Sequence, residues 1–182
     1  MAFDRISRRL VPALAAVLLI SACQTTVFDS TSDDPSAAPP PCPLVTVVDD
    51  AKRLTRFQGA GRDVTDVLFE AEIQPPRSSC VYREGGEIVI SMLVPIVVGV
   101  GTANQDGFAR FNYFVAIARG DNILVRQRFD VVVEFEGNDT RVGYADELEQ
   151  KIQLQGEELG NSYVVYVGIE LTPAEMEFNR QR

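Results

Sequence analysis

The side chains best suited to chemistry in this sequence are carboxylates. Asp146, Glu147 and Glu149 crowd one segment, and Glu157 and Glu158 stand together in another. Two carboxylates can hydrolyse a glycosidic bond when their surroundings separate the two pKa values. These residues lie among other polar residues, with no sign of the burial that such a separation needs. The sequence therefore predicts solvated strand or loop positions here.

Other kinds of catalytic or cofactor site lack essential parts. The sequence contains no histidine, which removes the usual triads, the commonest general base and the commonest metal ligand. Gly137-Asn138-Asp139 offers oxygen ligands without the ordered spacing of a calcium loop. The glycine-rich stretch 59–63 leads into a strand pattern, whereas a dinucleotide site needs a helix there. We expect no cofactor, no metal site and no enzymatic activity.

The first 23 residues have the layout of an export signal. Three arginines precede an apolar run over residues 10–20, which at about a dozen residues is short for a membrane-spanning helix. The run ends in Ile20-Ser21-Ala22-Cys23, which resembles the lipobox of bacterial lipoproteins, with Ile in place of the usual Leu. The resemblance implies that residues 1–22 are removed and that Cys23 is acylated. The alternative is an ordinary cleaved signal with Cys23 as an incidental residue.

The lipobox also implies a location. In bacterial lipoproteins an Asp after the acylated cysteine favours retention in the inner membrane, whereas Gln24 resembles the outer-membrane class. We expect a cell-envelope protein that is held on the membrane by its lipid and faces the periplasm, with the outer membrane favoured over the inner.

Charge narrows the range of partners. Residues 1–22 carry a net +2, so the chain, at a formal net charge of −9, becomes −11 once they are removed. Such a chain has no basic stripe to neutralise phosphates, which argues against nucleic acid. It would not adsorb to anionic lipid by charge either, so the acyl chains must hold it at the membrane.

Composition divides the mature chain in two. Residues 23–41 are rich in Ser, Thr and Pro and hold few bulky apolar side chains, so they cannot offset their own ordering entropy. We expect a disordered tether there. Residues 42–182 are numerous enough for one domain with a sizeable core, and two domains would be cramped.

Two cysteines remain once Cys23 is acylated. In an oxidising compartment the favoured state of Cys42 and Cys80 is a disulfide, which would close a loop of about 39 residues. The alternative is two buried free thiols.

The dominant period of the domain is two, the signature of β-strands. One segment, Ile88–Val100, is apolar at nearly every position, which predicts a central strand or strand pair covered on both faces, with Pro95 at a bend, bulge or edge. Glycine turns separate the strands, as at Glu84-Gly85-Gly86-Glu87. Alternation recurs in segments 66–73, 111–117, 122–135 and 163–171.

These elements are best accommodated by an all-β fold, an antiparallel immunoglobulin-like β-sandwich with a short C-terminal helix. A small closed β-barrel shares the alternation and is the alternative. The helix is indicated by Thr172-Pro173-Ala174-Glu175, a capping box with proline at the first helical position. Met176 or Phe178 should then dock the helix on the sandwich.

A lipid-anchored domain without catalytic parts is expected to bind. We predict that it binds another, unknown envelope protein through a sheet edge or rim loops, and the aromatic-rich stretch Phe108, Arg110, Phe111 and Tyr113 is the candidate rim. The alternative is a periplasmic carrier of small ligands, which requires an apolar cavity.

A second resemblance covers most of the domain. Arg53-Leu54-Thr55-Arg56-Phe57 and Gly61–Val67, with the Cys42-Pro43 start and the 172–180 end, look like a family of small uncharacterised lipoproteins from alphaproteobacteria. The resemblance implies the same location and implies no activity.

Overall fold

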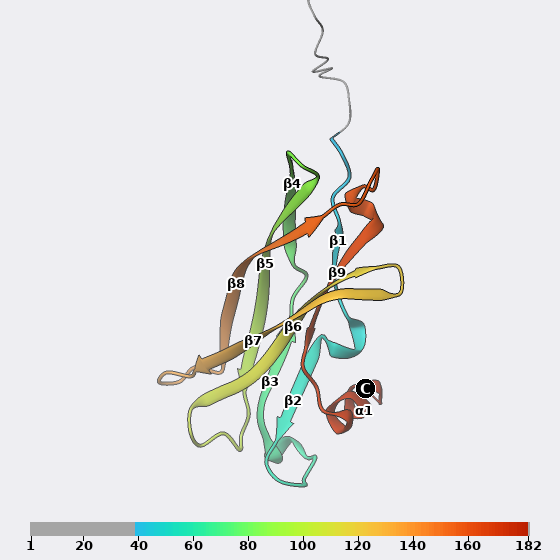
Figure 1. Cartoon of the computed structure of the whole chain (residues 1–182). Helices are drawn as coiled ribbons and strands as arrows, with labels where there is room; N and C mark the ends of the chain where they lie inside the picture. Colours follow the sequence, from blue (N-terminus) through green and yellow to red (C-terminus); the bar gives the residue numbers. More distant parts are fainter. Residues whose placement is uncertain (1–38, 182) are drawn as a thin grey trace, which may run out of the picture. The chain divides into compact units, whose positions relative to one another are not determined.

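The alternating segments become β-strands, and the chain folds as a sandwich of two sheets (Figure 1). The computed structural model describes residues 39–181. Its strands are β1 (Leu44–Val47), β2 (Arg53–Phe57), β3 (Val67–Ile73), β4 (Arg77–Arg83), β5 (Glu87–Val100), β6 (Phe108–Arg119), β7 (Asn122–Glu134), β8 (Arg141–Gln153) and β9 (Tyr163–Ile169). The helical elements are the 3-10 turns η1 (Asp49–Ala51), η2 (Val64–Asp66) and η3 (Gly160–Ser162) and the helix α1 (Pro173–Arg180).

The strands form two separate sheets. Sheet A has the order β1-β9-β6-β7, and sheet B contains β2, β3, β4, β5 and β8. All strand pairs are antiparallel except β1–β9, which is parallel. The structure therefore confirms the predicted β-sandwich with a short C-terminal helix, and its sheets do not close into a barrel.

Strand β5 is the centre of sheet B. One edge of β5 pairs with β8 along its length, and the other pairs first with β4 and then with β3. Pro95 lies where that partner changes, and its carbonyl accepts a hydrogen bond from the Gln74 N–H (2.8 Å). The N–H that proline lacks would point the same way, into the gap between β3 and β4, so Pro95 interrupts no ladder.

Only one face of β5 is covered by the other sheet. Its even-numbered residues, such as Ile90 and Val94, are buried in the core. The opposite face carries Leu93, Pro95 and Val97, which neighbouring side chains leave half-buried. The sequence predicts cover on both faces, and within residues 39–181 the structure provides it on one.

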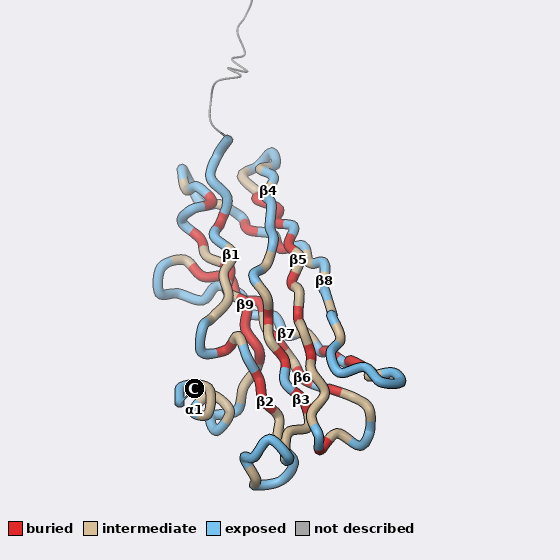
Figure 2. The backbone as a smooth tube through the Cα atoms, turned by 180° about the vertical axis from the view of Figure 1, so that it is seen from behind, coloured by how far each residue is buried: buried red, intermediate tan, exposed pale blue. Residues whose placement is uncertain are grey.

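The core lies between the sheets. In Figure 2 the buried residues gather along the inner strands, β9 among them, whereas the loops are exposed. The inward residues of both sheets form one hydrophobic cluster, and the Phe69 ring of β3 lies 5.9 Å from the Phe111 ring of β6. Contacts of this kind bury apolar surface at roughly 25 cal/mol per Å² and hold the layers together.

One lateral side of the sandwich is sealed by α1. The Phe178 ring of α1 packs edge-on against Phe57 of β2 at 5.1 Å, as the sequence predicts for one of the two candidate docking residues. Asn179 donates hydrogen bonds to the carbonyl oxygens of Asp50 in η1 (3.1 Å) and Arg53 in β2 (2.7 Å). Because η1 follows the edge strand of sheet A and β2 is the edge strand of sheet B, the helix joins the two edges.

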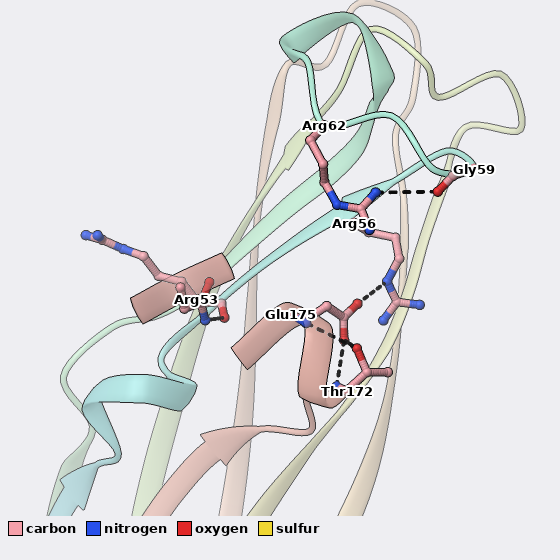
Figure 3. A network of polar contacts seen from close by, with 7 residues as sticks. Arg53, Arg56, Gly59, Arg62, Thr172 and Glu175 are labelled. Atoms are coloured by element: carbon pink, nitrogen blue, oxygen red, sulfur yellow. Dashed lines mark hydrogen bonds and ion pairs between the residues drawn. The ribbon is translucent and has the colours of Figure 1, made fainter. Parts of the chain in front are cut away.

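The predicted capping box fixes the start of this seal (Figure 3). The Thr172 side chain accepts from the Glu175 N–H (3.3 Å), and the Thr172 N–H donates to the Glu175 carboxylate (2.8 Å). The same carboxylate forms an ion pair with Arg56 of β2 at 2.9 Å. One acidic side chain therefore caps the helix and ties it to sheet B.

The start of the domain is fixed to sheet B as well. Cys42 and Cys80 form the predicted disulfide, with their Cα atoms 5.7 Å apart. The Tyr82 hydroxyl donates to the Pro41 carbonyl (2.6 Å) and accepts from the Gly160 N–H (2.7 Å). A Cβ on Gly160 would lie 2.5 Å from the Pro41 oxygen, so only glycine allows this approach.

Candidate partner-binding surface

The opposite lateral side of the sandwich is open. There sheet A ends in β7 and sheet B ends in β8, each 13 residues long. Within residues 39–181, β7 pairs only with β6, and β8 pairs only with β5. We call the outer backbone edges of these strands the β7 edge and the β8 edge. Unpaired edges of this length are ready templates for another strand.

The first half of β7 is exposed on both faces. All seven residues from Asn122 to Arg128 are exposed, including Ile123 (65%), Leu124 (47%) and Val125 (43%). Natural proteins usually protect an edge with charge or a covering loop rather than present adjacent apolar residues on it. This segment is therefore the strongest candidate for a binding surface in the described chain.

A bulge in this segment changes the face that Ile123 occupies. Ile117 of β6 faces Val125, while the next residue, Ala118, faces Ile123, so Leu124 is the extra residue. The bulge turns Ile123 to the outer face of sheet A and leaves Val125 on the inner face. The alternation of segment 122–135 predicts Ile123 and Val125 on one side of the strand, whereas the bulge places them on opposite faces. The run Ile123-Leu124-Val125 breaks the alternation of apolar and polar residues, and this break is the sequence feature that indicates a bulge.

The two open edges border a small apolar cleft. The cleft has a volume of about 130 Å³. Leu124 and Val125 of β7 line its apolar part with Ile117, Ile152 and Tyr163, and Arg119 and Lys151 are among the polar residues around it. A segment added at the β7 edge could place a side chain against this cleft.

Polar contacts hold the open side at a fixed width. The Tyr113 hydroxyl of β6 donates to Asp146 of β8 (2.6 Å), and Tyr144 donates to the other oxygen of that carboxylate (2.8 Å). Gln150 of β8 donates to Gln127 of β7 (3.0 Å). Burial and, next, the Asp146 hydrogen bond raise the pKa of Tyr144 to about 12, and the same causes raise that of Tyr113. Both hydroxyls are therefore protonated donors at neutral pH.

The outer face of sheet A beside β7 carries two arginines that share one acidic partner. Arg126 and Arg128 both form ion pairs with Glu170, at 3.2 and 3.5 Å. Arg126 also lies over the Phe114 ring, 4.3 Å from its centroid. Both arginines stay more than half exposed, so a further carboxylate can reach them.

The structure divides the predicted rim residues into two pairs. Phe111 and Tyr113 point into the core, 5% and 0% exposed, so they offer no contact surface and are corrected to core residues. Phe108 and Arg110 point to the outer face of sheet A, where the guanidinium lies 4.4 Å from the ring centroid. Arg110 pairs across the strands with Val132, so both remaining candidates adjoin β7.

Arg110 also stabilises the loop before β6. It forms a 2.9 Å ion pair with Asp106. The Phe108 N–H, and after it Arg110, lower the pKa of Asp106. The rim candidates are thus part of a structured turn beside the end of β7.

The acidic residues of the two clusters lie in different surroundings. Glu147 and Glu149 lie on the exposed outer face of β8, away from the inward-pointing Asp146. Glu158 accepts hydrogen bonds from Arg119 (2.8 Å) and from the Tyr163 hydroxyl (2.5 Å). The Tyr163 hydrogen bond lowers the pKa of Glu158, and burial opposes this shift. Among the residues described, no group of three or more carboxylate or cysteine side chains could hold a metal ion, and residues 137–139 form a plain turn between β7 and β8.

Two larger hollows lie on the outer face of sheet B. One, of about 630 Å³, spans β2, β3 and β5 and is lined by charged residues such as Arg53, Glu72 and Arg141. The other, of about 540 Å³, spans β4, β5 and β8 and includes Arg77, Glu147 and Leu93. Both are open to solvent and include charged side chains in their lining, whereas a small-ligand carrier needs an apolar cavity.

Comparison with known proteins found no relative of this chain. No family model, no curated protein and no solved structure matches the chain. None of the helices within residues 39–181 has the length and hydropathy to cross a bilayer. The predicted signal peptide and the acylated Cys23 lie outside the described residues.

Proposed function

We propose that this protein is a lipid-anchored binding protein of the cell envelope whose β7 edge takes up an extended segment of another envelope component. The observation that carries the proposal is the exposure of seven consecutive residues, Asn122–Arg128, on an edge strand with Ile123, Leu124 and Val125 among them. Strand addition at such an edge combines backbone hydrogen bonds with pockets for alternate side chains.

The asymmetry of the sandwich supports this use of β7. On the sealed side, α1 and the Cys42–Cys80 disulfide bind the short edge strands to the rest of the domain. On the open side, a hydrogen bond from Gln150 of β8 to Gln127 of β7 joins two side chains that point inward. The outward backbone of β7 is left for a partner.

Binding fits the side chains better than catalysis does. The chain lacks histidine, and its two remaining cysteines are joined in a disulfide. The inward carboxylate of Asp146 is engaged by two tyrosine hydroxyls, which position it as a structural acceptor. A lipid at Cys23 and an unstructured tether would give such a domain reach from the membrane, with the outer membrane favoured.

Purification of the full-length protein from its own membranes tests the proposal. Val125→Lys places an ammonium on the inner side of the β7 edge, where an added strand would bury it, so we expect the bound envelope component to be lost. Val81→Lys, at another exposed valine on β4 (61%, against 43% for Val125), is the control and should retain the component. Equal recovery of the component with Val125→Lys would contradict a role for the β7 edge.

A further inference from the structure

The two open edges carry opposite charge patterns on their outer faces. On β7 the outward residues include Arg126, Arg128 and Glu134. On β8 they include Arg141, Glu147 and Glu149. Strands with such patterns would attract each other if they were neighbours in a sheet.

One antiparallel register matches all of these charges. It places Arg126 opposite Glu149, Arg128 opposite Glu147 and Glu134 opposite Arg141. No two like charges face each other, and the outward residues of β7 meet the outward residues of β8. On the inner face the same register places Val133 opposite Val142 and Val131 opposite Tyr144.

Within one chain this register is not used. Strand β7 belongs to sheet A and β8 to sheet B, and no ladder between them is present in residues 39–181. Their pairing with β6 and β5 places the two strands in opposite layers, and the inward Gln127–Gln150 hydrogen bond joins those layers. Each strand therefore has an open edge, and the edge that would complement it belongs to the other strand, in the opposite sheet of the same chain.

We infer that the strand taken up by the β7 edge is β8 of a second copy of this protein. The inference rests on the proposed function, because it uses the same edge, and it names the partner. Sheet A of one copy would continue into sheet B of the next, with three charge pairs setting the register. Glu170 does not block these pairs, since each guanidinium has five donors and both arginines are more than half exposed.

Pairing of β7 with β7 satisfies fewer groups. The register that places Arg128 opposite Asp130 also places Arg126 opposite Val132 and Leu124 opposite Glu134. By contrast, β7–β8 pairing is head-to-tail and leaves a free β8 edge on one copy and a free β7 edge on the other. Repetition would build open chains of copies. Anchoring in a membrane would favour them by raising the effective concentration.

Cysteine pairing between two differently tagged full-length copies tests the inference in the cell. One copy carries Arg128→Cys and the other Glu147→Cys, and facing Cβ atoms about 5 Å apart can form a disulfide. We expect a mixed disulfide that joins the two tags. Arg128→Cys with Lys151→Cys is the matched control, because position 151 lies about 13 Å along the strand from position 147 and should give none.

Charge reversal provides a second, independent readout. Arg126→Glu with Arg128→Glu reverses the β7 edge, and Glu147→Lys with Glu149→Lys reverses the β8 edge. Each double variant alone should lose co-purification of the two tags by about tenfold or more, and mixing the two variants should restore it. All four side chains are exposed, so the fold should survive, and the mass of the Cys42–Cys80 disulfide form checks it.

The outcomes separate this inference from the proposed function. An adduct of the Arg128→Cys variant with an unrelated envelope protein, and none with a second copy, would overturn the second copy as partner and keep β7 as a binding edge. A disulfide between two copies of the Arg128→Cys variant would replace head-to-tail pairing by a two-fold pair. If the thiol introduced at position 128 forms no adduct and the two tags do not co-purify, both the second copy as partner and the β7 edge as a binding surface are overturned.

Discussion

The Tyr113 hydroxyl donates a 2.6 Å hydrogen bond to the Asp146 carboxylate across the two sheets of the sandwich. Tyr113 is fully buried in β6, and Asp146 belongs to the edge strand β8, so the bond spans the open side of the fold. This is the side where no helix joins the two sheets in the described chain. A buried donor therefore sets the spacing between the sheets beside the β7 edge.

Removal of the acceptor should destabilise the domain. Asp146→Ala leaves the buried Tyr113 hydroxyl without its partner, and we expect the free energy of unfolding to fall by about 1–3 kcal/mol. Glu147→Ala, one residue along and on the outer face, should change it by less than about 0.5 kcal/mol. Denaturant unfolding of both variants measures the difference, and equal effects would show that Asp146 has no special role.

The same contacts predict a loss of stability in alkaline solution. Burial and the Asp146 hydrogen bond raise the pKa of Tyr144 to about 12, whereas tyrosines in the unfolded chain ionise near about 10. Between these values the unfolded chain releases a proton that the native state retains, so stability is full below about pH 10 and declines as the pH rises through 12. We expect Tyr144→Phe to decline less steeply in unfolding measurements between pH 9 and 12. An unchanged slope would assign the decline to other groups.

The disulfide should contribute a large part of the stability. Replacement of both Cys42 and Cys80 by serine frees a loop that spans 38 positions, and the chain-entropy model gives a loss of about 3–4 kcal/mol. Denaturant midpoints of the native and double-serine proteins measure it. If the loss stays below about 1 kcal/mol, the Tyr82 contacts with Pro41 and Gly160 are sufficient to fix the start of the domain.

Lipidation of Cys23 has a direct test in the cell. Cys23→Ser removes the thiol that would be acylated, so we expect the protein to leave the membrane fraction or to keep its signal peptide. Fractionation and intact mass distinguish these results from the native protein. A Cys23→Ser protein that is still cleaved before residue 23 and still sediments with membranes would show that the lipobox resemblance is misleading.

Local sequence patterns predict much of this fold because their causes are local. The capping box of Thr172 and Glu175 and the glycines at positions 85 and 86, with φ of 79° and 77°, specify their structures through neighbouring residues alone. The Cys42–Cys80 disulfide is predicted from the expected oxidising compartment and from the even number of cysteines left after Cys23 is acylated. Each of these predictions is confirmed by the structure.

The surface could not be predicted in the same way, because it depends on which strands become neighbours. The alternation of residues 111–117 already groups Phe111 and Tyr113 on one face. Which face turns inward depends on where the other sheet packs, and the structure buries this one while Phe108 and Arg110 face out. The exposure of Ile123 depends on a bulge opposite Ala118 and on the position of β7 at a sheet edge. Sheet order is a long-range property that one sequence with several alternating segments does not define.

Backbone hydrogen exchange along β7 tests the central claim most directly. Full-length protein in its own membranes is compared with the same protein purified in detergent and diluted until it is free of its partner. Edge amides that gain hydrogen-bond acceptors exchange more slowly. We expect amides within Asn122–Glu134 to be protected in the membranes and exposed after dilution, while amides of α1 stay unchanged. Equal exchange of β7 in the two states would contradict strand addition at this edge.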